Sequence, residues 1–222
     1  MLQSAAVKSE ALSRIEALGL VPSIRTESAT DAMYAVEAVH AAGINVVEIT
    51  MTVPGAIDLI RNLVKRFGSE ILVGAGTVTS VEIAKECADA GAGFIGAPIF
   101  DKKVVEFCKQ SEVPSLPGAF TPTEIFTACK SGADAVKVYP CSAAGGPPYI
   151  AALKTVIPDA VLIPAGGVTL ENITEYIRAG AIAAAVGTEL IDVRSIREGN
   201  VALLTRRGRQ FVYAVRSARS LV

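Results

Sequence analysis

The chain has 222 residues and a formal net charge of −1, and 51% of its residues are hydrophobic. This near-neutral charge argues against a general nucleic-acid partner. No run approaches the roughly 18 uncharged apolar residues that a membrane helix needs, so we expect no membrane partner. Lys8, Arg14 and Glu16 interrupt the apolar positions of the N-terminus. That pattern is unlike a signal peptide and predicts a cytoplasmic protein.

Strand-like and helix-like segments alternate along the chain after an amphipathic helix expected around Ser4–Leu18. Short apolar runs predict strands at Leu20–Arg25, Asn45–Thr50, Ile71–Gly74, Gly93–Gly96, Pro114–Leu116, Ala133–Val138, Val161–Ile163 and Ala181–Val186. Helical patterns between them lie at Ala29–Ala42, Gly55–Phe67, Ser80–Ala90, Lys102–Gln110, Pro122–Lys130, Pro148–Val156 and Leu170–Ala179, followed by a C-terminal helical segment.

Strand–helix units that repeat about every two dozen residues are typical of an α/β fold, the TIM (β/α)8 barrel, here with an extra N-terminal helix. An open doubly wound sheet is the alternative. It usually has fewer strands and a glycine-rich first turn, whereas Arg25-Thr-Glu-Ser follows the first strand here. No stretch has the composition of a linker, so we expect residues 1–222 to form a single barrel domain.

The cysteines and the single histidine limit the chemistry that this chain can perform. Cys87, Cys108, Cys129 and Cys141 form no CxxC pair, so we expect reduced thiols that pack against the barrel. His40, the only histidine, lies on a predicted helix. A zinc site built on several histidines is excluded, and a Ser-His-Asp triad is not expected. An enzyme of this sequence would therefore use a carboxylate for acid–base work.

Lys137 lies inside a short apolar run that reads as a buried strand of a parallel sheet. Side-chain alternation places Ala135, Lys137 and Tyr139 on one face of it. Burial disfavours a charged ammonium, and a free amine is what a Schiff-base nucleophile needs. The alternative is a lysine at a strand end whose ammonium reaches solvent.

Glu48 interrupts the apolar run of the second predicted strand, where it shares a face with Val46, Thr50 and Thr52. A glutamate facing the helix layer would need a buried partner. At the mouth of a barrel opposite Lys137, it would have a partner and could shuttle protons for a nucleophile. A purely structural Glu–Lys pair is the alternative.

Other polar residues lie in phase at the ends of neighbouring strands, where catalytic groups of a barrel are found. Ser23 and Arg25 share a face of the first strand, and Thr77 is in phase with Val73 and Ala75 on the third. Gly166-Gly167 and Gly187-Thr188 follow the seventh and eighth strands. Glycines between a strand and a helix let backbone N–H groups approach a phosphate, so these loops predict an anion site. Turns that simply need glycine are the alternative.

Together these residues resemble the class I aldolases of the 2-keto-3-deoxy-6-phosphogluconate (KDPG) and 4-hydroxy-2-oxoglutarate (KHG) family. The resemblance extends from about Val21 to Leu190. The motifs that carry it are Gly43-Ile-Asn-Val-Val-Glu48-Ile-Thr50, Gly74-Ala-Gly-Thr77-Val, Pro98, Pro117-Gly118, Thr121-Pro-Thr-Glu124, Gly132 with Lys137-Val-Tyr-Pro140, and Pro164-Ala-Gly166-Gly167-Val.

The resemblance implies that Lys137 forms the Schiff base and that Glu48 is the proton shuttle. It places Arg25 and Thr77 near the keto-acid carboxylate. Further residues implied in substrate binding are Thr50, Thr52, the pocket prolines Pro98 and Pro117, and the phosphate-loop residues Gly166, Gly167, Gly187 and Thr188. Many members carry an arginine where this chain has Thr52, so the carboxylate contact could fall to Arg25. This departure affects substrate choice rather than the Schiff base.

The implied reaction cleaves a 2-keto-4-hydroxy acid, with KDPG giving pyruvate and glyceraldehyde 3-phosphate, and KHG giving pyruvate and glyoxylate. No cofactor or metal is expected, because a protonated imine acts as the electron sink. Family members are commonly homotrimers. The alternatives are an aldolase for a galactonate-type or unphosphorylated sugar acid, a phosphosugar isomerase or decarboxylase that uses Lys137 as a point charge, and a barrel that binds phosphorylated metabolites without turnover.

Overall fold

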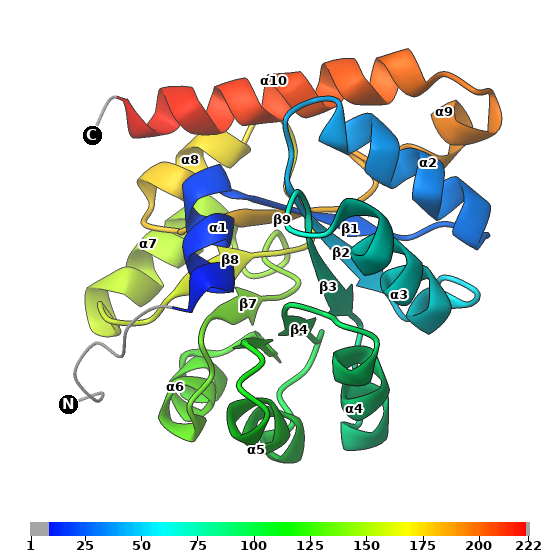
Figure 1. Cartoon of the computed structure of the whole chain (residues 1–222). Coiled ribbons are helices and arrows are strands. Elements are labelled where there is room, and N and C mark those ends of the chain that lie inside the picture. The colour runs from blue at the N-terminus through cyan, green and yellow to red at the C-terminus, as the bar shows by residue number, and fades with distance from the viewer. Residues whose placement is uncertain (1–8, 221–222) are drawn as a thin grey trace.

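The computed structural model describes residues 9–220, in which short parallel strands form a central barrel surrounded by helices (Figure 1). The strands are β1 (Leu20–Ile24), β2 (Val46–Thr50), β3 (Leu72–Gly76), β4 (Ile95–Gly96), β5 (Ser115–Leu116), β6 (Gly118–Ala119), β7 (Val136–Val138), β8 (Leu162–Pro164) and β9 (Ala184–Val186). The helices are α1 (Glu10–Leu18), α2 (Ala29–His40), α3 (Ala56–Phe67), α4 (Val81–Asp89), α5 (Lys102–Gln110), α6 (Pro122–Ser131), α7 (Pro147–Val156), α8 (Ile173–Arg178), α9 (Val193–Arg197) and α10 (Val201–Arg219).

The strands form two parallel sheets, in the orders β5-β4-β3-β2-β1-β9 and β6-β7-β8. The two sheets meet at two seams. At one, the chain passes from β5 to β6 through Pro117, and at the other a bridge pairs Ala165 with Ala185. The result is the predicted TIM-type α/β barrel. The fifth predicted strand, Pro114–Leu116, is followed after Pro117 by a further short strand, β6. The two are separated because proline supplies no N–H for a continuous ladder.

The inside of the barrel has its own apolar core. Val46, Phe94 and Leu116 are buried there, together with Leu12 and Ile15 of α1. The extra N-terminal helix therefore contributes to the barrel core, as an amphipathic helix does when its apolar side is covered. The expected start of this helix near Ser4 lies outside the described residues, and its described part begins at Glu10.

A second, larger core lies between the strands and the helices. Val47 and Ile49 of β2 point into it, whereas Val46 on the same strand points into the barrel. This is the alternation that the sequence predicts. The C-terminal helix α10 packs against α8 and α2 through Leu204, Phe211 and other buried residues. The largest differences from the predicted helices are α8, which starts at Ile173 rather than near Leu170, and the predicted C-terminal segment, which is divided into α9 and α10.

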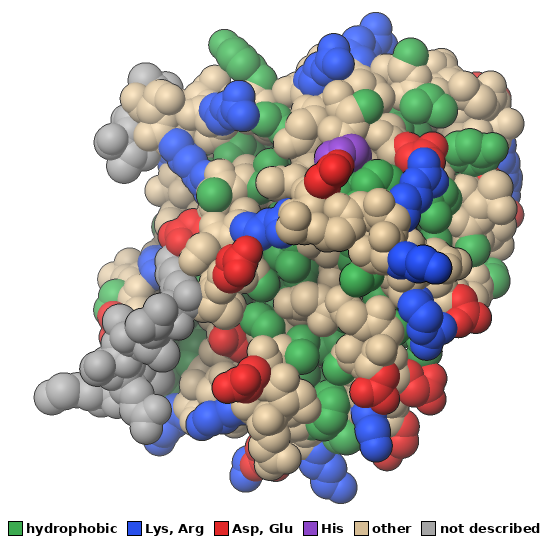
Figure 2. Space-filling model, viewed as in Figure 1, with side chains coloured by type: hydrophobic (Ala, Val, Ile, Leu, Met, Phe, Trp, Pro, Cys, Tyr) green, Lys and Arg blue, Asp and Glu red, His purple; other side chains and the backbone are tan. Residues whose placement is uncertain are grey.

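The surface carries both signs of charge. On the face shown in Figure 2, basic and acidic side chains are interspersed, and no large area of one sign is visible. Among the helices of residues 9–220, none combines the length and the apolar composition of a membrane-spanning segment.

Candidate active site

Glu48 and Lys137 are the only ionisable side chains among the buried polar residues of the described chain. They are 2% and 6% exposed, and Lys137 Nζ donates a hydrogen bond to Glu48 Oε2. Taking both charges out of water is costly unless they pair. The arrangement therefore keeps a buried amine and a buried carboxylate in direct contact, and a proton can pass between them.

The strand pattern explains why these two side chains meet. Ala135 belongs to the core inside the barrel, while Val136 and Val138 belong to the layer under the helices. Alternation then directs Lys137 inward, as predicted. Glu48 follows the inward-facing Val46 by the same rule. β2 and β7 belong to different sheets, and only the closing of the barrel brings the two residues together.

Two glycines make room for the Glu48 carboxylate. A Cβ on Gly76 would lie 2.3 Å from Glu48 Oε1, and a Cβ on Gly96 would lie 2.6 Å from Oε2 and 3.0 Å from Lys137 Nζ. Real Cβ atoms do not approach so closely, because such distances lie well inside van der Waals contact. Gly76 and Gly96 are therefore needed for the pair to lie at this depth. Neither glycine is among the predicted site residues.

Arg25 and Thr77 lie together at the ends of β1 and β3. Arg25 Nη2 donates to Thr77 Oγ1 at 3.3 Å, and Arg25 is exposed. Since Thr77 accepts this bond, its own hydroxyl proton is free for another acceptor. Thr77 also has a φ of 61°, which is rare for a β-branched residue. Such strained backbone clusters at active sites. A guanidinium and a hydroxyl donor are well suited to hold a carboxylate.

The hydroxyl groups of Thr50 and Thr52 are hydrogen-bonded to each other. Thr50 Oγ1 donates to the carbonyl oxygen of Ile24 at 3.0 Å and lies 2.8 Å from Thr52 Oγ1. A hydroxyl has one proton, so Thr52 is the donor in the second bond. Thr52 then offers only lone pairs to a ligand. Arg25 and Thr77, the two residues expected near a keto-acid carboxylate, therefore remain the side-chain donors at this rim, whereas Thr52 has no proton to offer.

Gly166 and Gly167 form a loop after β8 in which both residues have a φ of 80°, a conformation that favours glycine. Their carbonyl oxygens accept hydrogen bonds from Ser142 N and Asn172 Nδ2. A trans peptide holds its N–H opposite its C=O. The N–H groups of Gly167 and Val168 therefore point away from these partners, which leaves the loop able to offer donors to an anion.

The loop after β9 differs from the one predicted. Gly187 accepts hydrogen bonds from Leu190 N and Ile191 N in a turn, and Thr188 is exposed. Helix α9 begins only at Val193. The Asp192 carboxylate already caps its N-terminus, accepting from Arg194 N. The sequence pattern predicts that Gly187 and Thr188 lead directly into a helix N-terminus. In the structure they do not, because a turn separates them from α9.

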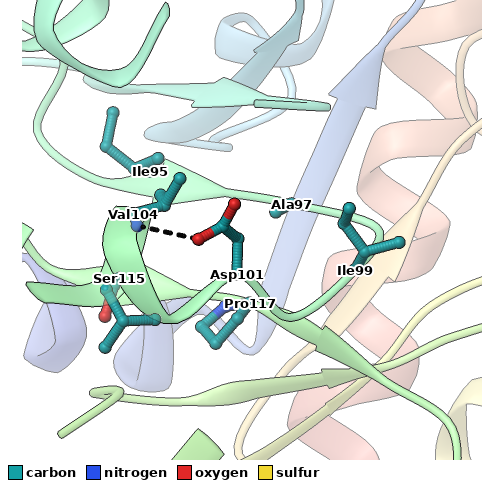
Figure 3. Close-up of a pocket in the computed structure, with 8 residues that line it drawn as sticks. Ile95, Ala97, Ile99, Asp101, Val104, Ser115 and Pro117 are labelled. Atoms are coloured by element: carbon teal, nitrogen blue, oxygen red, sulfur yellow. Dashed lines mark hydrogen bonds between the residues drawn. The ribbon is translucent and has the colours of Figure 1, made fainter. Parts of the chain in front are cut away.

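The two predicted pocket prolines lie in different places. Pro98 is half-buried in the segment after β4, where Gly118 allows its backbone to pass close by. Pro117 is buried, and its carbonyl accepts from Lys137 N at 2.9 Å. The Pro117 ring lines a small cavity toward Val104 of α5 (Figure 3). It does not line the barrel mouth, because the inward position of this strand belongs to Leu116.

That cavity is not a substrate site. Its volume of about 10 Å³ has room for about one water molecule. Its acidic group, Asp101, caps α5 by accepting from Lys103 N and Val104 N, the second of which is drawn in Figure 3. His40 is also remote from the chemistry, since its ring packs edge-on against Phe67 and faces Glu70.

One residue in contact with the charged pair was missed among the sequence candidates. Ser23 Oγ donates to Glu48 Oε1 at 3.2 Å. The signal was present in the sequence, because Ser23 shares a face of its strand with Arg25. A serine in a strand is common, however, and only the pairing of Ser23 with Glu48 in the β1–β2 register places the two side by side.

Comparison with known proteins finds aldolases that are similar to this chain over most of its length. The family described as KDPG and KHG aldolase matches residues 12–207. The 2-dehydro-3-deoxy-6-phosphogalactonate aldolase of Escherichia coli strain K12 is 37% identical over 174 residues, which cover 78% of this chain and 84% of that protein. The 2-dehydro-3-deoxy-phosphogluconate aldolase of Treponema pallidum is 31% identical over 206 residues, covering 93% and 96%.

A solved structure is similar as well. The KDPG aldolase of Legionella pneumophila, with pyruvate captured as a covalent carbinolamine, superposes with a TM-score of 0.84 at 28% identity. The match covers 91% of this chain and 98% of that one. The family match spans most of the barrel, and two relatives exceed 30% identity over most of their length. The chain therefore belongs to the KDPG and KHG aldolase family and is a carbon–carbon lyase.

Proposed function

We propose that this aldolase works through a Schiff base formed by Lys137, with Glu48 as the proton shuttle. The observation that carries the proposal is the buried contact between Lys137 Nζ and Glu48 Oε2 inside the barrel. Transfer of one proton across this contact gives a neutral amine and a neutral acid, and the net charge stays at zero. The amine then attacks the C2 carbonyl of a 2-keto-4-hydroxy acid to form a carbinolamine.

Each later step uses the same two groups. Protonated Glu48 gives its proton to the carbinolamine hydroxyl, water leaves, and a protonated imine forms beside the carboxylate. The carboxylate removes the C4 hydroxyl proton, directly or through water, and the C3–C4 electrons move into the imine to give an enamine and a free aldehyde. Glu48 returns its proton to C3, and hydrolysis releases pyruvate and Lys137. The Legionella relative, with its pyruvate carbinolamine, supports this route.

For the substrate we propose KDPG, which would give pyruvate and glyceraldehyde 3-phosphate, with KHG as a smaller substrate giving pyruvate and glyoxylate. Arg25 and Thr77 are the proposed carboxylate ligands. The Gly166–Gly167 loop is the proposed donor for a distal phosphate, with Gly187 and Thr188 nearer its edge. Membership of the aldolase family sets aside an isomerase, a decarboxylase or a barrel without turnover.

The galactonate epimer is the second candidate substrate, because the Escherichia coli 6-phosphogalactonate relative is 37% identical. The two acids differ only at C4, next to the bond that breaks. A comparison of kcat/KM for both epimers, with and without phosphate, tests the choice. A higher kcat/KM for the galactonate epimer would overturn KDPG, and equal values for phosphorylated and unphosphorylated acids would overturn the phosphate site.

Trapping with borohydride tests the Schiff base directly. Wild-type protein incubated with pyruvate and sodium borohydride should gain the mass of one reduced pyruvate adduct, on a peptide that contains Lys137. Lys154→Met provides a matched control, because Lys154 donates to backbone carbonyls of Pro158 and Ala160 on the outer side of the barrel. An adduct on any other lysine, or none at all, would contradict the proposed chemistry.

We propose further that residues 1–222 form one domain that acts as a cytoplasmic homotrimer, as the family resemblance implies. Exposed apolar side chains support an assembly, since Ile99, Phe120 and Phe126 are 52%, 39% and 44% exposed near the ends of β4 and β6. Light scattering coupled to size-exclusion chromatography measures the mass in solution, and a monomer at working concentrations would contradict the trimer.

A further inference from the structure

Ser23 contacts the Glu48 carboxylate from the side opposite Lys137. Its hydroxyl donates to Oε1 at 3.2 Å, while the amine of Lys137 donates to Oε2. Ser23 pairs directly with Glu48 in the β1–β2 register, and it is half-buried. Because this register sets the contact, the bond is built into the sheet rather than made by a mobile side chain. Its length is no objection, since catalytic hydrogen bonds are often long without substrate and shorten in the complex.

The two contacts make the carboxylate oxygens unequal. A hydroxyl that donates to Oε1 favours negative charge on that oxygen, so a proton carried by Glu48 is better placed on Oε2. Oε2 is also the oxygen that faces the amine. Gly76 lies against Oε1 and Gly96 against Oε2, each so close that a Cβ would overlap the carboxylate. The carboxylate thus has little room to rotate and exchange its two oxygens.

We propose that Ser23 is a positioning residue, which holds Oε1 of Glu48 so that Oε2 is the oxygen that exchanges protons at Lys137 Nζ. This inference rests on the proposed Schiff-base function and assigns the division of work within its proton shuttle. Ser23 itself exchanges no proton with substrate.

The surroundings of Glu48 contain few other groups that could perform this task. β3 and β4 present Gly76 and Gly96, β7 presents Lys137, and β1 presents Ser23 with Arg25 two residues farther along. Arg25 is bonded to Thr77. Within the described residues, Lys137 is the one charged group that hydrogen-bonds to Glu48, and Ser23 is the one neutral side chain that does so.

Exchange of the C3 protons of pyruvate with D2O measures the shuttle without an aldehyde partner, because it needs only imine and enamine formation. Ser23→Ala should slow this exchange by about 10- to 100-fold, which corresponds to the loss of a hydrogen bond to a charged group. The borohydride adduct at Lys137 should still form completely at long times. Ser23→Thr keeps the hydroxyl and should restore most of the exchange rate.

Ser115→Ala is the matched control, since Ser115 is another strand serine, 2% exposed, whose hydroxyl bonds Asp134 on the helix side. It should exchange at the wild-type rate. Glu48→Gln and the double variant Ser23→Ala with Glu48→Gln complete a cycle. If Ser23 acts through Glu48, the double variant should be no slower than Glu48→Gln alone.

The outcomes separate the two proposals. Wild-type exchange in Ser23→Ala, or additive losses in the double variant, would overturn the role of Ser23 and leave the Schiff base intact. Equal losses in Ser23→Ala and Ser23→Thr would also overturn it, because the hydroxyl would then be irrelevant. Absence of any adduct in the wild-type protein, or full activity of Glu48→Gln, would overturn the proposed function itself.

Discussion

The two ends of the barrel interior are built from the same strands but have opposite character. At the N-terminal end, Val46 of β2 and Ala135, which directly precedes β7, pack with Phe94 and with helix α1. Two residues farther along the same strands, Glu48 and Lys137 form a buried ion pair. A step of two residues advances a strand by about 6.6 Å. A single inward-facing row thus changes from apolar to charged within a short distance.

The comparison teaches that stability and chemistry are separated along the strand axis. The N-terminal, lower end gains stability from burial of apolar surface, at roughly 25 cal/mol per Å². The C-terminal, upper end carries the Glu48–Lys137 pair, whose desolvation cost can exceed its mutual attraction. In the proposed mechanism the pair is present for its chemistry, whereas the apolar layer beneath it contributes stability. Changes that make one end resemble the other test this separation.

The largest effect is expected when the upper end is made apolar. Glu48→Leu combined with Lys137→Met should reduce kcat by more than about 10⁴-fold, as loss of a nucleophile does. Stability should stay the same or rise by about 1–4 kcal/mol, because similar-sized apolar residues replace a buried ion pair. Urea unfolding and steady-state kinetics measure both quantities.

The single variant Lys137→Met is the control for this change. It leaves the Glu48 carboxylate buried without its partner and should cost about 3–5 kcal/mol of stability. If the double variant is less stable than Lys137→Met, the ion pair is a structural element of the fold and the separation between the two ends is wrong.

The next largest effect is expected when glycine is replaced by alanine at two levels of the barrel interior, in the apolar layer at Gly74 and beside the charged pair at Gly96. A Cβ on Gly74 would lie 2.2 Å from Phe94 Cζ, and one on Gly96 would lie 2.6 Å from Glu48 Oε2. Gly96→Ala should lower kcat by about 10²-fold, the cost of a misplacement near 1 Å. Gly74→Ala should instead lower the free energy of unfolding by about 1–3 kcal/mol through overpacking.

Neither glycine has a positive φ, so alanine suits both backbones, and the two variants control for each other. Thermal unfolding and kcat are measured on both. Should Gly74→Ala lose kcat as strongly as Gly96→Ala while remaining folded, the apolar layer would have a direct part in catalysis.

A smaller effect is expected at the rim above the charged pair. Arg25→Leu should raise KM by about 10- to 100-fold, because it removes a charge-assisted hydrogen bond to the substrate carboxylate. The kcat value should change less, since Arg25 bonds Thr77 rather than Glu48 or Lys137. Arg61→Leu makes the same charge change on the exposed side of α3, where Arg61 pairs with Asp58, and should leave KM unaltered. A similar rise in KM for both variants would show that the effect comes from the change in net charge and not from a contact between Arg25 and the substrate.

The smallest effect concerns the layer outside the barrel, where burial raises the pKa of Cys87 to about 11 and that of Cys108 to about 12. A raised thiol pKa keeps the neutral form at pH 8, and only the thiolate reacts with iodoacetamide. Native protein at pH 8 should therefore label slowly at both residues and rapidly in urea. The stability linked to these thiols is present below the ordinary pKa and is lost as pH rises through 11 to 12. Rapid native labelling, followed by peptide mass spectrometry, would show that this layer opens.

Much of the fold could be predicted from the sequence, because strand and helix patterns are local. The alternation in Val-Val-Glu-Ile-Thr and Ala-Val-Lys-Val already directs Glu48 and Lys137 to one side of their strands, and the structure agrees. The break at Pro117 and the late start of α8 at Ile173 were missed. At Pro117 the missing N–H interrupts the ladder although the apolar pattern continues. Before Ile173, the Asn172 side chain accepts from Thr169 N and donates to the Gly167 carbonyl, and the helix begins only after this turn.

The sequence by itself determined which side chains face inward, through a period of two residues that needs no partner strand. Only the tertiary structure decided which inward side chains meet. The Ser23–Glu48 bond depends on the β1–β2 register, the Glu48–Lys137 contact on closure of two sheets, and the depth of the pair on Gly76 and Gly96. These contacts join residues far apart in the chain, and their distances follow from how the strands pack rather than from any local pattern.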